Sequence, residues 1–499
     1  MTGHTGHGAP CLAVFGTGSD VGKSVVATAL CRHFANLGVR VAPYKAQNMS
    51  NNSGVTPEGL EMGRAQIVQA EACRLAPHVD MNPVLLKPTS DVGAQVVVMG
   101  RAVENATAVQ YHRQKEALFK DACGALERLR RDYDLVIMEG AGSCAEVNLM
   151  AQDIVNFPMA EYADAPVILV ADIHRGGVFG QIVGTLACLS ENQRQQVAGS
   201  IINRFRGDLT LFEDGAWWIE EKTGKPVLGV LPWRSDIRID PEDSVVIERP
   251  ARVSASNACR PAVAVIRIPH ISNFTDFDPL DAVAGLNLYF LESPQDLSSF
   301  DAVILPGSKN TRHDLGWLHQ IGWTDRVTRY RAGGGRVTGI CGGYQMMGRT
   351  VEDPGGLEGP PGSTPGLCLL PVDTILMAPK TTTRTCFAWD GDVSIGYEIH
   401  MGRTERSSGR PLFDLLARNE TPCTGSDGCR TDDDRCLGTY IHGLFDNPGI
   451  TRRWLDLMGL DELDVPEVLG MASRDREYDR LAAHFERHVD MTTIRALVE

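Results

Sequence analysis

Short runs of Val, Ile and Leu alternate with helical patterns and turn residues along most of this chain, and this alternation constrains the fold more than any other feature. Apolar runs of about four to eight residues are typical of strands covered on both faces, and helices between successive strands are typical of a parallel sheet. The alternation therefore predicts an α/β fold with a mostly parallel sheet. The first series of predicted strands comprises Cys11–Gly16, Val39–Tyr44, Asp134–Met138, Pro166–Ala171, Gly199–Asn203 and Val227–Leu231.

A polar, proline-containing stretch at 241–261 separates this series from a second one. The second series begins with Ala262–Ile268, Ala302–Leu305 and Val337–Ile340. Because 499 residues are more than one hydrophobic core normally contains, we expect two α/β domains, over 11–240 and 262–450. The remaining predicted segments are a flexible tail over 1–10, a linker over 241–261, a surface insertion over 419–435 and a helical extension over 451–499.

Charge and cysteine content exclude several classes of partner. The chain has 48 Lys and Arg residues against 63 Asp and Glu residues, which gives a formal net charge of −15. An acidic surface argues against nucleic acid or an anionic membrane as the main partner, although a local pocket can still hold an anionic substrate. The 13 cysteines lack a paired C-x-x-C framework, and no apolar stretch resembles a signal peptide or a membrane span. We expect a reduced, cytoplasmic protein, and the composition leaves a homo-oligomer open.

The first predicted strand leads into a glycine-rich loop, Gly16-Thr17-Gly18-Ser19-Asp20-Val21-Gly22-Lys23-Ser24, and then into an amphipathic helix over Val25–Leu37. Backbone N–H groups at such a helix N-terminus bind phosphate, a lysine reaches the terminal phosphates, and a serine hydroxyl ligates Mg²⁺. The strict G-x-x-x-x-G-K-S spacing fails by one residue, because Thr17 stands where the first glycine belongs. The sequence nevertheless predicts an ATP site with Mg²⁺. Its expected contacts are Gly16, Thr17, Gly22, Lys23 and Ser24.

Two residues at strand ends are candidates for the same site. Glu139 ends the run that begins at Asp134, and open α/β sheets bind ligands at the carboxyl edge of their strands. We expect its carboxylate to bind Mg²⁺; the alternative is an acid that caps a helix. Asn203 ends another strand and is a candidate to hydrogen-bond an adenine edge, with an ordinary turn residue as the alternative.

The segment after the second predicted strand, Pro43–Gly54, is dense in amides and hydroxyls. A polar loop at the ligand-binding edge of the sheet can hold a substrate or an acyl phosphate. We expect Lys45 to act as a clamp on that acyl phosphate and Gln47 and Asn48 to contact the substrate. A solvated surface lysine is the alternative for Lys45.

Cys341 stands where the apolar run Val337–Ile340 stops and glycines take over. Gly339, Gly342 and Gly343 allow a sharp strand-to-helix turn and let a substrate approach the thiol. The N–H groups and dipole of the following helix favour a thiolate. A buried core cysteine is the alternative. The glycines on both sides favour a nucleophile.

A nucleophilic cysteine needs a base, and His442 and His400 are the candidates because both lie in turn-rich settings. A thiol–imidazole pair generates thiolate near neutral pH and returns the proton to a leaving amine, which suits amide hydrolysis. We expect backbone N–H groups at Gly307, in the turn Pro306-Gly307-Ser308, and at Gly342 to stabilise the oxyanion. For the turn at Gly307, an ordinary strand end is the alternative.

Several longer motifs carry a family resemblance. The motif around Cys341, together with 305–311 before it and 438–445 after it, resembles class I-type glutamine amidotransferases of the cobyric acid synthase group. The glycine-rich loop resembles that of dethiobiotin synthetase-like enzymes. Together the similar motifs extend over roughly residues 11 to 450. Further runs similar to that group are Lys45–Ser50, Gly63–Gln66, Met81–Pro88, Met138–Ser143, Arg204–Asp208, Arg267–Asp276 and Gly396–Thr404.

The resemblance implies an ATP-dependent synthase domain over 11–240 and a glutamine amidotransferase domain over 262–450. It implies that four carboxylates of a corrinoid, adenosylcobyrinic acid a,c-diamide, are amidated to give adenosylcobyric acid. Glutamine would be the nitrogen donor, with Cys341 attacking its side-chain amide and His442 as acid/base partner. ATP would phosphorylate each carboxylate, and ammonia would displace the phosphate.

Two positions depart from the expected patterns. Class I amidotransferases typically place Glu two residues after the catalytic histidine, whereas this chain has Leu444, so the residue that orients His442 is left open. His174 stands where related sequences commonly have Asp, while Asp172 remains a candidate acid at the phosphate site. The alternative functions are a cobyrinic acid a,c-diamide synthase and a partition-type nucleotide switch with an inactive amidotransferase-like domain. The presence of both Cys341 and His442 argues against the switch.

Overall fold

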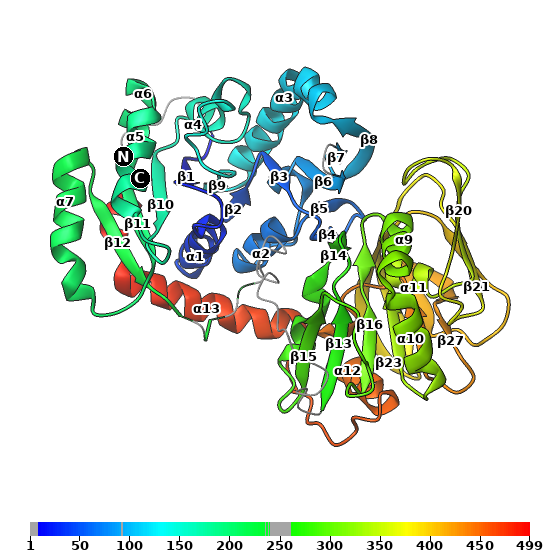
Figure 1. Ribbon diagram of the computed structural model, residues 1–499. Helices are drawn as coiled ribbons and strands as arrows, with labels where there is room; N and C mark the ends of the chain where they lie inside the picture. Colours follow the sequence, from blue (N-terminus) through cyan, green and yellow to red (C-terminus); the bar gives the residue numbers. More distant parts are fainter. Residues whose placement is uncertain (1–7, 91–92, 235, 238, 240–260) are drawn as a thin grey trace.

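The computed structural model describes residues 8–90, 93–234, 236–237, 239 and 261–499. Residues 241–260 of the predicted linker and most of the predicted tail therefore lie outside the described residues. The chain forms two α/β bodies, each with its own parallel sheet, as the alternation of apolar runs predicts (Figure 1). Every helix in the described part of the chain is too short or too polar to cross a bilayer.

The N-terminal sheet has six parallel strands in the order β12-β11-β10-β1-β9-β2. Alternate residues of β1 face opposite sides: Ala13 and Phe15 join one apolar cluster, whereas Leu12 and Val14 join the other. Such two-sided burial explains why the strands are continuous apolar runs rather than alternating ones. The strands are β1 (Cys11–Gly16), β2 (Val41–Tyr44), β9 (Leu135–Glu139), β10 (Val167–Asp172), β11 (Val197–Phe205) and β12 (Val227–Pro232). The helices are α1 (Lys23–Asn36), α3 (Ala108–Asp132), α4 (Phe157–Ala163), α5 (Val178–Cys188), α6 (Glu191–Gln196) and α7 (Glu213–Thr223), with 3-10 turns η2 (Met150–Gln152) and η3 (Leu209–Phe212).

A second layer of this domain lies on the side that faces the C-terminal domain (Figure 1). It contains a four-stranded sheet, in the order β3-β6-β7-β8, and a two-stranded hairpin, β4-β5. The layer begins directly after Lys45, so the amide-rich segment predicted to hold substrate forms the junction between the main sheet and this layer. Its elements are β3 (Gln47–Met49), β4 (Ser53–Val55), β5 (Glu61–Gly63), α2 (Arg64–Ala72), η1 (Val79–Met81), β6 (Val84–Ser90), β7 (Gly93–Val98) and β8 (Arg101–Thr107).

The C-terminal domain has a sheet in the order β15-β13-β16-β18-β28-β27, parallel except for β27 at its edge. Helices α9, α10 and α11 pack on one face, and α8 and α12 pack on the other. The strands are β13 (Ala262–Ile266), β15 (Asn287–Leu291), β16 (Ala302–Leu305), β18 (Val337–Ile340), β27 (Cys429–Arg430) and β28 (Cys436–Thr439). The helices are α8 (Asp278–Asp281), α9 (Thr311–Ile321), α10 (Trp323–Ala332), α11 (Gly342–Met346) and α12 (Pro448–Leu457), with η6 (Phe274–Phe277), η7 (Leu444–Asp446) and the short ladder β14 (Ile271–Ser272)–β17 (Gly307–Ser308).

Two further four-stranded sheets complete this domain, and they correct one prediction. The segment 419–435, expected as a surface insertion, instead contains strands β26 and β27. Asn419 and Glu420 both have positive φ angles, 46° and 64°, which is the turn geometry that joins two strands in a tight hairpin. The polar composition of the segment reflects this hairpin at a sheet edge. The strands are β19 (Thr350–Asp353), β20 (Gly362–Pro365), β21 (Val372–Ile375) and β24 (Arg403–Arg406) in one sheet, and β22 (Thr381–Trp389), β23 (Asp392–His400), β25 (Phe413–Arg418) and β26 (Thr421–Asp427) in the other.

The C-terminal helices return to the N-terminal domain. Helix α13 (Gly470–His488) runs beneath the N-terminal domain and reaches the edge of the C-terminal one in Figure 1. With α14 (Met491–Ala496), it completes the apolar cluster around α1. The fully buried guanidinium of Arg32 in α1 pairs with the carboxylates of Asp475 and Asp479, each at 2.8 Å. Arg474 lies between the two domains and pairs with Glu71 of α2 at 3.0 Å and with Asp446 of η7 at 3.3 Å.

Candidate functional site

The predicted nucleophile occupies a strained turn between β18 and α11. Cys341 has φ 52° and ψ −109°, a combination that L-residues rarely adopt and that is typical of nucleophile elbows. A Cβ atom on Gly343 would lie 2.0 Å from the backbone oxygen of Leu305, and one on Gly342 would lie 2.7 Å from the backbone nitrogen of Ser308. Only glycine fits at these two positions, which explains the glycine pair after the cysteine.

His442 is the histidine that the structure brings to Cys341. The two side chains line the same cavity and interact electrostatically, and His442 Nδ1 lies 2.6 Å from Asp276 Oδ2. Burial lowers the pKa of His442, but the charge and hydrogen bond of Asp276, together with the interaction with Cys341, outweigh burial and raise that pKa to about 10. The imidazole is therefore held as a cation beside the sulfur. The other candidate, His400, stacks on Tyr440 instead, with ring centroids 3.6 Å apart.

Asp276 resolves the question raised by Leu444. Leu444 is buried in the apolar core, and the carboxylate that orients His442 comes from η6, 166 residues earlier in the chain. The second oxygen of Asp276 accepts a hydrogen bond from the Gly443 backbone at 3.0 Å, so both oxygens are used. Sequence reasoning missed this residue. Its only signal was its place at the end of the run Arg267–Asp276, which was similar to the resembled family.

The support of His442 extends into the N-terminal domain. The ring of Tyr397 stacks on His442, with centroids 5.2 Å apart, and the Tyr397 hydroxyl accepts a hydrogen bond from Asn273 at 3.2 Å. Asn273 Oδ1 in turn accepts from the backbone of Ser53 at 3.2 Å. Thr275 Oγ1 donates to Asn52 Oδ1 at 3.3 Å. Loop 52–53 of the N-terminal domain is thus hydrogen-bonded to the turn that carries Asp276.

Gly307 lies in the β14–β17 ladder, where it pairs with Ser272. A Cβ atom on Gly307 would lie 3.1 Å from Cε1 of His442, so this strand passes directly beside the imidazole. Gly342 is the first residue of α11, where backbone N–H groups have no partner within the helix. The oxyanion-binding role of both glycines stays a prediction.

Cys341 and His442 line a cavity of about 660 Å³. Its walls come from both domains, because Lys87, Gln95 and Val103 of the second N-terminal layer face residues of the C-terminal domain across it. The cavity therefore lies between the two domains. Other residues that line it include Lys309, Glu358, Lys380 and His400.

The glycine-rich loop forms a tight cradle at the end of β1. A Cβ atom on Gly16 would lie 2.8 Å from Val21 and 2.9 Å from the backbone oxygen of Gly18, and Gly22 has φ 99°. Lys23 folds over the loop and donates to the backbone oxygens of Gly18 at 2.9 Å and Gly142 at 2.8 Å. Thr17 Oγ1 donates to Gln181 at 3.3 Å. The conformation is that of a phosphate-binding loop at a helix N-terminus.

The two predicted metal ligands meet at this loop. Ser24 Oγ donates to Glu139 Oε1 at 2.8 Å, and Lys45 Nζ lies 3.0 Å from the same oxygen. Glu139 is 1% exposed and also accepts from the Gln69 amide, so it binds side chains rather than capping a helix. Lys45 is buried beside it, which excludes a solvated surface lysine. A buried carboxylate and a hydroxyl at the edge of a phosphate loop suit Mg²⁺, which prefers oxygen ligands.

Three other predicted contacts are already engaged within the protein. Asn203 Nδ2 donates to the backbone oxygen of Val21 at 2.9 Å, so this side chain holds the phosphate loop. Asn48 donates to Gln66 at 2.9 Å, and Gln47 accepts a hydrogen bond from Tyr111. Contact of these three amides with adenine or substrate stays a prediction.

Asp172 and His174, which the sequence analysis singled out, lie at the end of β10 and just after it. Asp172 pairs with Arg204 at 2.9 Å, and Arg204 also pairs with Asp20 of the phosphate loop at 2.9 Å. The His174 ring packs against Trp233, with centroids 5.3 Å apart. Asp172 therefore supports the loop through Arg204, and His174 belongs to an aromatic contact.

One domain carries a phosphate-binding loop with a buried carboxylate beside it, and the other carries a Cys–His–Asp array. Together they define a nucleotide-binding domain fused to a class I-type glutamine amidotransferase. Family models agree: residues 12–246 match the CobQ/CobB/MinD/ParA nucleotide binding domain, and residues 262–450 match the CobB/CobQ-like glutamine amidotransferase domain. A solved glutamine amidotransferase is 18% identical, with a TM-score of 0.31, and the match covers 40% of this chain and 98% of that one.

Full-length relatives narrow the class to one family. Cobyric acid synthase of Chlorobium phaeobacteroides (strain BS1) is 52% identical, and the match covers 98% of this chain and 99% of that protein. The cobyric acid synthase of Chlorobaculum tepidum is 48% identical, with 97% of each chain covered. That of Syntrophobacter fumaroxidans is 44% identical, with 98% of each chain covered. The chain belongs to the cobyric acid synthase family, and the predicted family and fold class are confirmed.

Proposed function

We propose that this protein converts adenosylcobyrinic acid a,c-diamide to adenosylcobyric acid by four ATP-dependent amidations, with glutamine as the nitrogen donor. The observation that carries the proposal is the buried Cys341–His442–Asp276 array in the same chain as the phosphate loop. One site can release ammonia, and the other can activate a carboxylate. The corrinoid substrate rests on the name of the full-length relatives.

The amidotransferase domain supplies ammonia. The Cys341 sulfur attacks the side-chain amide carbon of glutamine, and the imidazolium of His442 donates its proton to the leaving nitrogen. Asp276 keeps the imidazole oriented, with the Nδ1 proton toward the carboxylate. We assign the oxyanion to backbone N–H groups at Gly342 and in the turn that contains Gly307. Water then cleaves the thioester, which releases glutamate and restores the thiolate.

The synthase domain activates the acceptor. A carboxylate is a poor electrophile until one oxygen becomes part of a phosphate leaving group, so a phosphoryl transfer from ATP must come first. Ser24 and Glu139 would hold Mg²⁺, which neutralises phosphate charge when bound. Lys23 neutralises the transferring phosphoryl group. Lys45, at 3.0 Å from Glu139, is suited to bind the acyl phosphate that ammonia then displaces.

Mass spectrometry of the corrinoid product tests the proposal. The enzyme is incubated with ATP, Mg²⁺, glutamine and the a,c-diamide, and the amides added to each molecule are counted. Four added amides are expected. A product with no added amide would refute the assignment. In a parallel incubation with cobyrinic acid in place of the a,c-diamide, addition of only two amides would identify an a,c-diamide synthase.

A cysteine variant separates the two sites. Cys341→Ala is expected to abolish amidation from glutamine but to retain amidation when ammonium is supplied, because the synthase site needs only free ammonia. Cys368→Ala, which changes an exposed cysteine of the same domain, is the matched control and should behave as the parent. Glutamine hydrolysis at the parental rate by Cys341→Ala would remove the cysteine from the mechanism.

A further inference from the structure

The cavity beside Cys341 contains more charge than the ammonia-releasing reaction uses. Three lysines line it, Lys87, Lys309 and Lys380, together with the carboxylate of Glu358. Glutamine hydrolysis at the thiol involves the side-chain amide of the substrate, not its charged end. The question is therefore which charged group these side chains recognise.

Two of the three lysines are already paired with one carboxylate. Lys87 Nζ lies 2.7 Å from Glu61 Oε1 and donates to Ser53 Oγ at 2.7 Å. Lys380 pairs with the other oxygen of Glu61 and also donates to Gln95 at 3.3 Å. This pairing crosses the domain boundary, because Glu61 belongs to the N-terminal domain and Lys380 to the C-terminal one. It leaves one positive charge in excess at Glu61.

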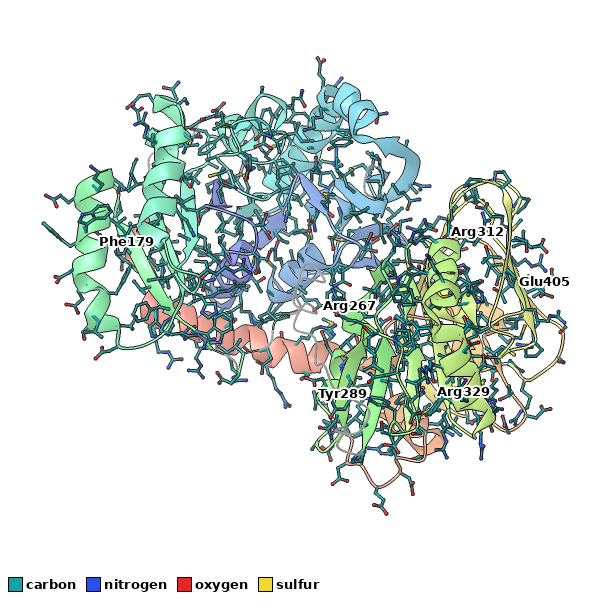
Figure 2. All side chains as sticks on the ribbon, viewed as in Figure 1. Phe179, Arg267, Tyr289, Arg312, Arg329 and Glu405 are labelled. Atoms are coloured by element: carbon teal, nitrogen blue, oxygen red, sulfur yellow. The ribbon has the colours of Figure 1, made fainter. Side chains whose placement is uncertain are left out.

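Lys309 and Glu358 are different, because neither has an ion-pair partner among the described residues. Glu358 accepts one hydrogen bond, from the backbone of Arg312 at 3.0 Å, at the start of α9 where Figure 2 labels Arg312. Burial and repulsion from Lys380 and Lys87 lower the pKa of Lys309 to about 7, and burial raises the pKa of Glu358 to about 7. A partner of opposite charge would therefore stabilise the charged form of each of these two side chains.

The positions of these two groups match one class of ligand. The Lys309 ammonium and the Glu358 carboxylate line the same cavity and interact electrostatically, yet they do not approach within ion-pair distance of each other. A cation and an anion that line one cavity without pairing are complementary to a zwitterion whose carboxylate and ammonium share one carbon. Lys309 directly follows the Gly307–Ser308 strand, and that strand contacts the Cys341 turn. The two charged groups and the Cys341 thiol therefore line one cavity, which an amino acid and its side-chain amide could share.

We propose that Lys309 binds the α-carboxylate of the substrate glutamine and that Glu358 binds its α-ammonium group. The proposal rests on the glutaminase activity assigned to Cys341. It makes Lys309 and Glu358 the residues that select an amino acid over other primary amides. It also explains why a carboxylate and an ammonium without an ion-pair partner line the same cavity as the nucleophile.

Kinetics with matched substrates test the proposal. Lys309→Met should raise the KM for glutamine about 10- to 100-fold with little change in kcat, because a charge-assisted contact made equally in ground and transition states is lost. Glu358→Gln should act in the same way. Lys222→Met, at an exposed position of α7, is the control and should match the parent.

Substrate analogues identify which end each residue binds. 4-Carbamoylbutanoate lacks the α-ammonium group of glutamine, and glutamine α-amide lacks the α-carboxylate. The parent should prefer glutamine over both. Glu358→Gln should lose selectivity only against the first analogue, and Lys309→Met only against the second. Unchanged selectivity in both variants would overturn the assignment while leaving Cys341 as the nucleophile.

Amidation with ammonium in place of glutamine shows whether Lys309 and Glu358 bind glutamine or the corrinoid acceptor. Both variants should amidate the corrinoid with ammonium at the parental rate, which also shows that they are folded. A raised KM for the corrinoid in this assay would mean that Lys309 binds a carboxylate of the acceptor, and it would overturn the proposal. Loss of glutamine hydrolysis from the parent protein itself would instead refute the proposed function.

Discussion

Replacing Asp276 by asparagine tests how the histidine is controlled. One oxygen of Asp276 accepts from the Gly443 backbone and the other from His442 Nδ1. Asparagine has a single oxygen, so if the backbone N–H keeps it, the amide NH₂ faces Nδ1 and forces the imidazole proton onto Nε2. The ring then cannot accept a proton from the thiol. The lost charge-assisted hydrogen bond alone amounts to about 1.5–3 kcal/mol, which corresponds to a fall of about 10- to 150-fold in kcat/KM at about 1.4 kcal/mol per factor of ten.

The pH dependence of the variant adds a second, independent measurement. Asp276 raises the pKa of His442 to about 10, so the imidazolium persists through neutral pH and is lost only in alkali. Without the carboxylate charge that pKa falls, and the alkaline limb of glutaminase activity should move to lower pH. Release of glutamate is assayed from pH 6 to 10, with Asp281→Asn, an exposed carboxylate of the neighbouring helix, as control. Parental kcat/KM and an unmoved alkaline limb in folded Asp276→Asn would refute the role of this residue.

Three further predictions concern the synthase site and the contact between domains. Lys23→Ala should abolish amidation even with ammonium while sparing glutamine hydrolysis, and product formation measured by mass spectrometry would contradict its role at the phosphates. Glu139→Gln should raise the Mg²⁺ concentration needed for half-maximal amidation, and an unchanged Mg²⁺ titration would exclude it as a ligand. Arg474→Ala should lower the free energy of unfolding by about 1–3 kcal/mol, because buried Glu71 loses its main partner. Arg474 helps to hold the pKa of Glu71 at about 2 rather than 4.5, so this loss should be largest at neutral pH and should shrink as denaturation is followed below about pH 4.5.

Local sequence patterns were sufficient to predict most of the strands of the two parallel sheets. Strands buried on both faces must be continuous apolar runs, and nine of these runs correspond to strands whose ends differ by at most two residues, such as Ala302–Leu305. The strained turn at Cys341 was predictable for a similar reason, because glycine is the only residue that fits beside Leu305 and Ser308. The pairing of Ser24 with Glu139 followed from the rule that parallel strands end at a common edge.

Long-range partners were not predictable in this way. Asp276 reaches His442 from 166 residues away through a turn of η6, and no local periodicity connects them. The cross-domain pairing of Glu61 with Lys380 depends on how two separately folded layers meet. The hairpin at Asn419–Glu420 was missed because its turn requires two positive φ angles without a glycine, which composition does not reveal.

Because α13 packs on the N-terminal domain, that domain cannot be separated from the rest of the chain by a single cut near residue 262. Tyr478, Leu481 and Phe485 fill the apolar surface of α1, so residues near the end of the chain complete a core that belongs, in sequence, to its beginning. A fragment that stops before residue 262 would expose that surface to water and should aggregate. A usable isolated nucleotide-binding half would have to be a chimera in which the segment 470–496 is grafted back by a new connection.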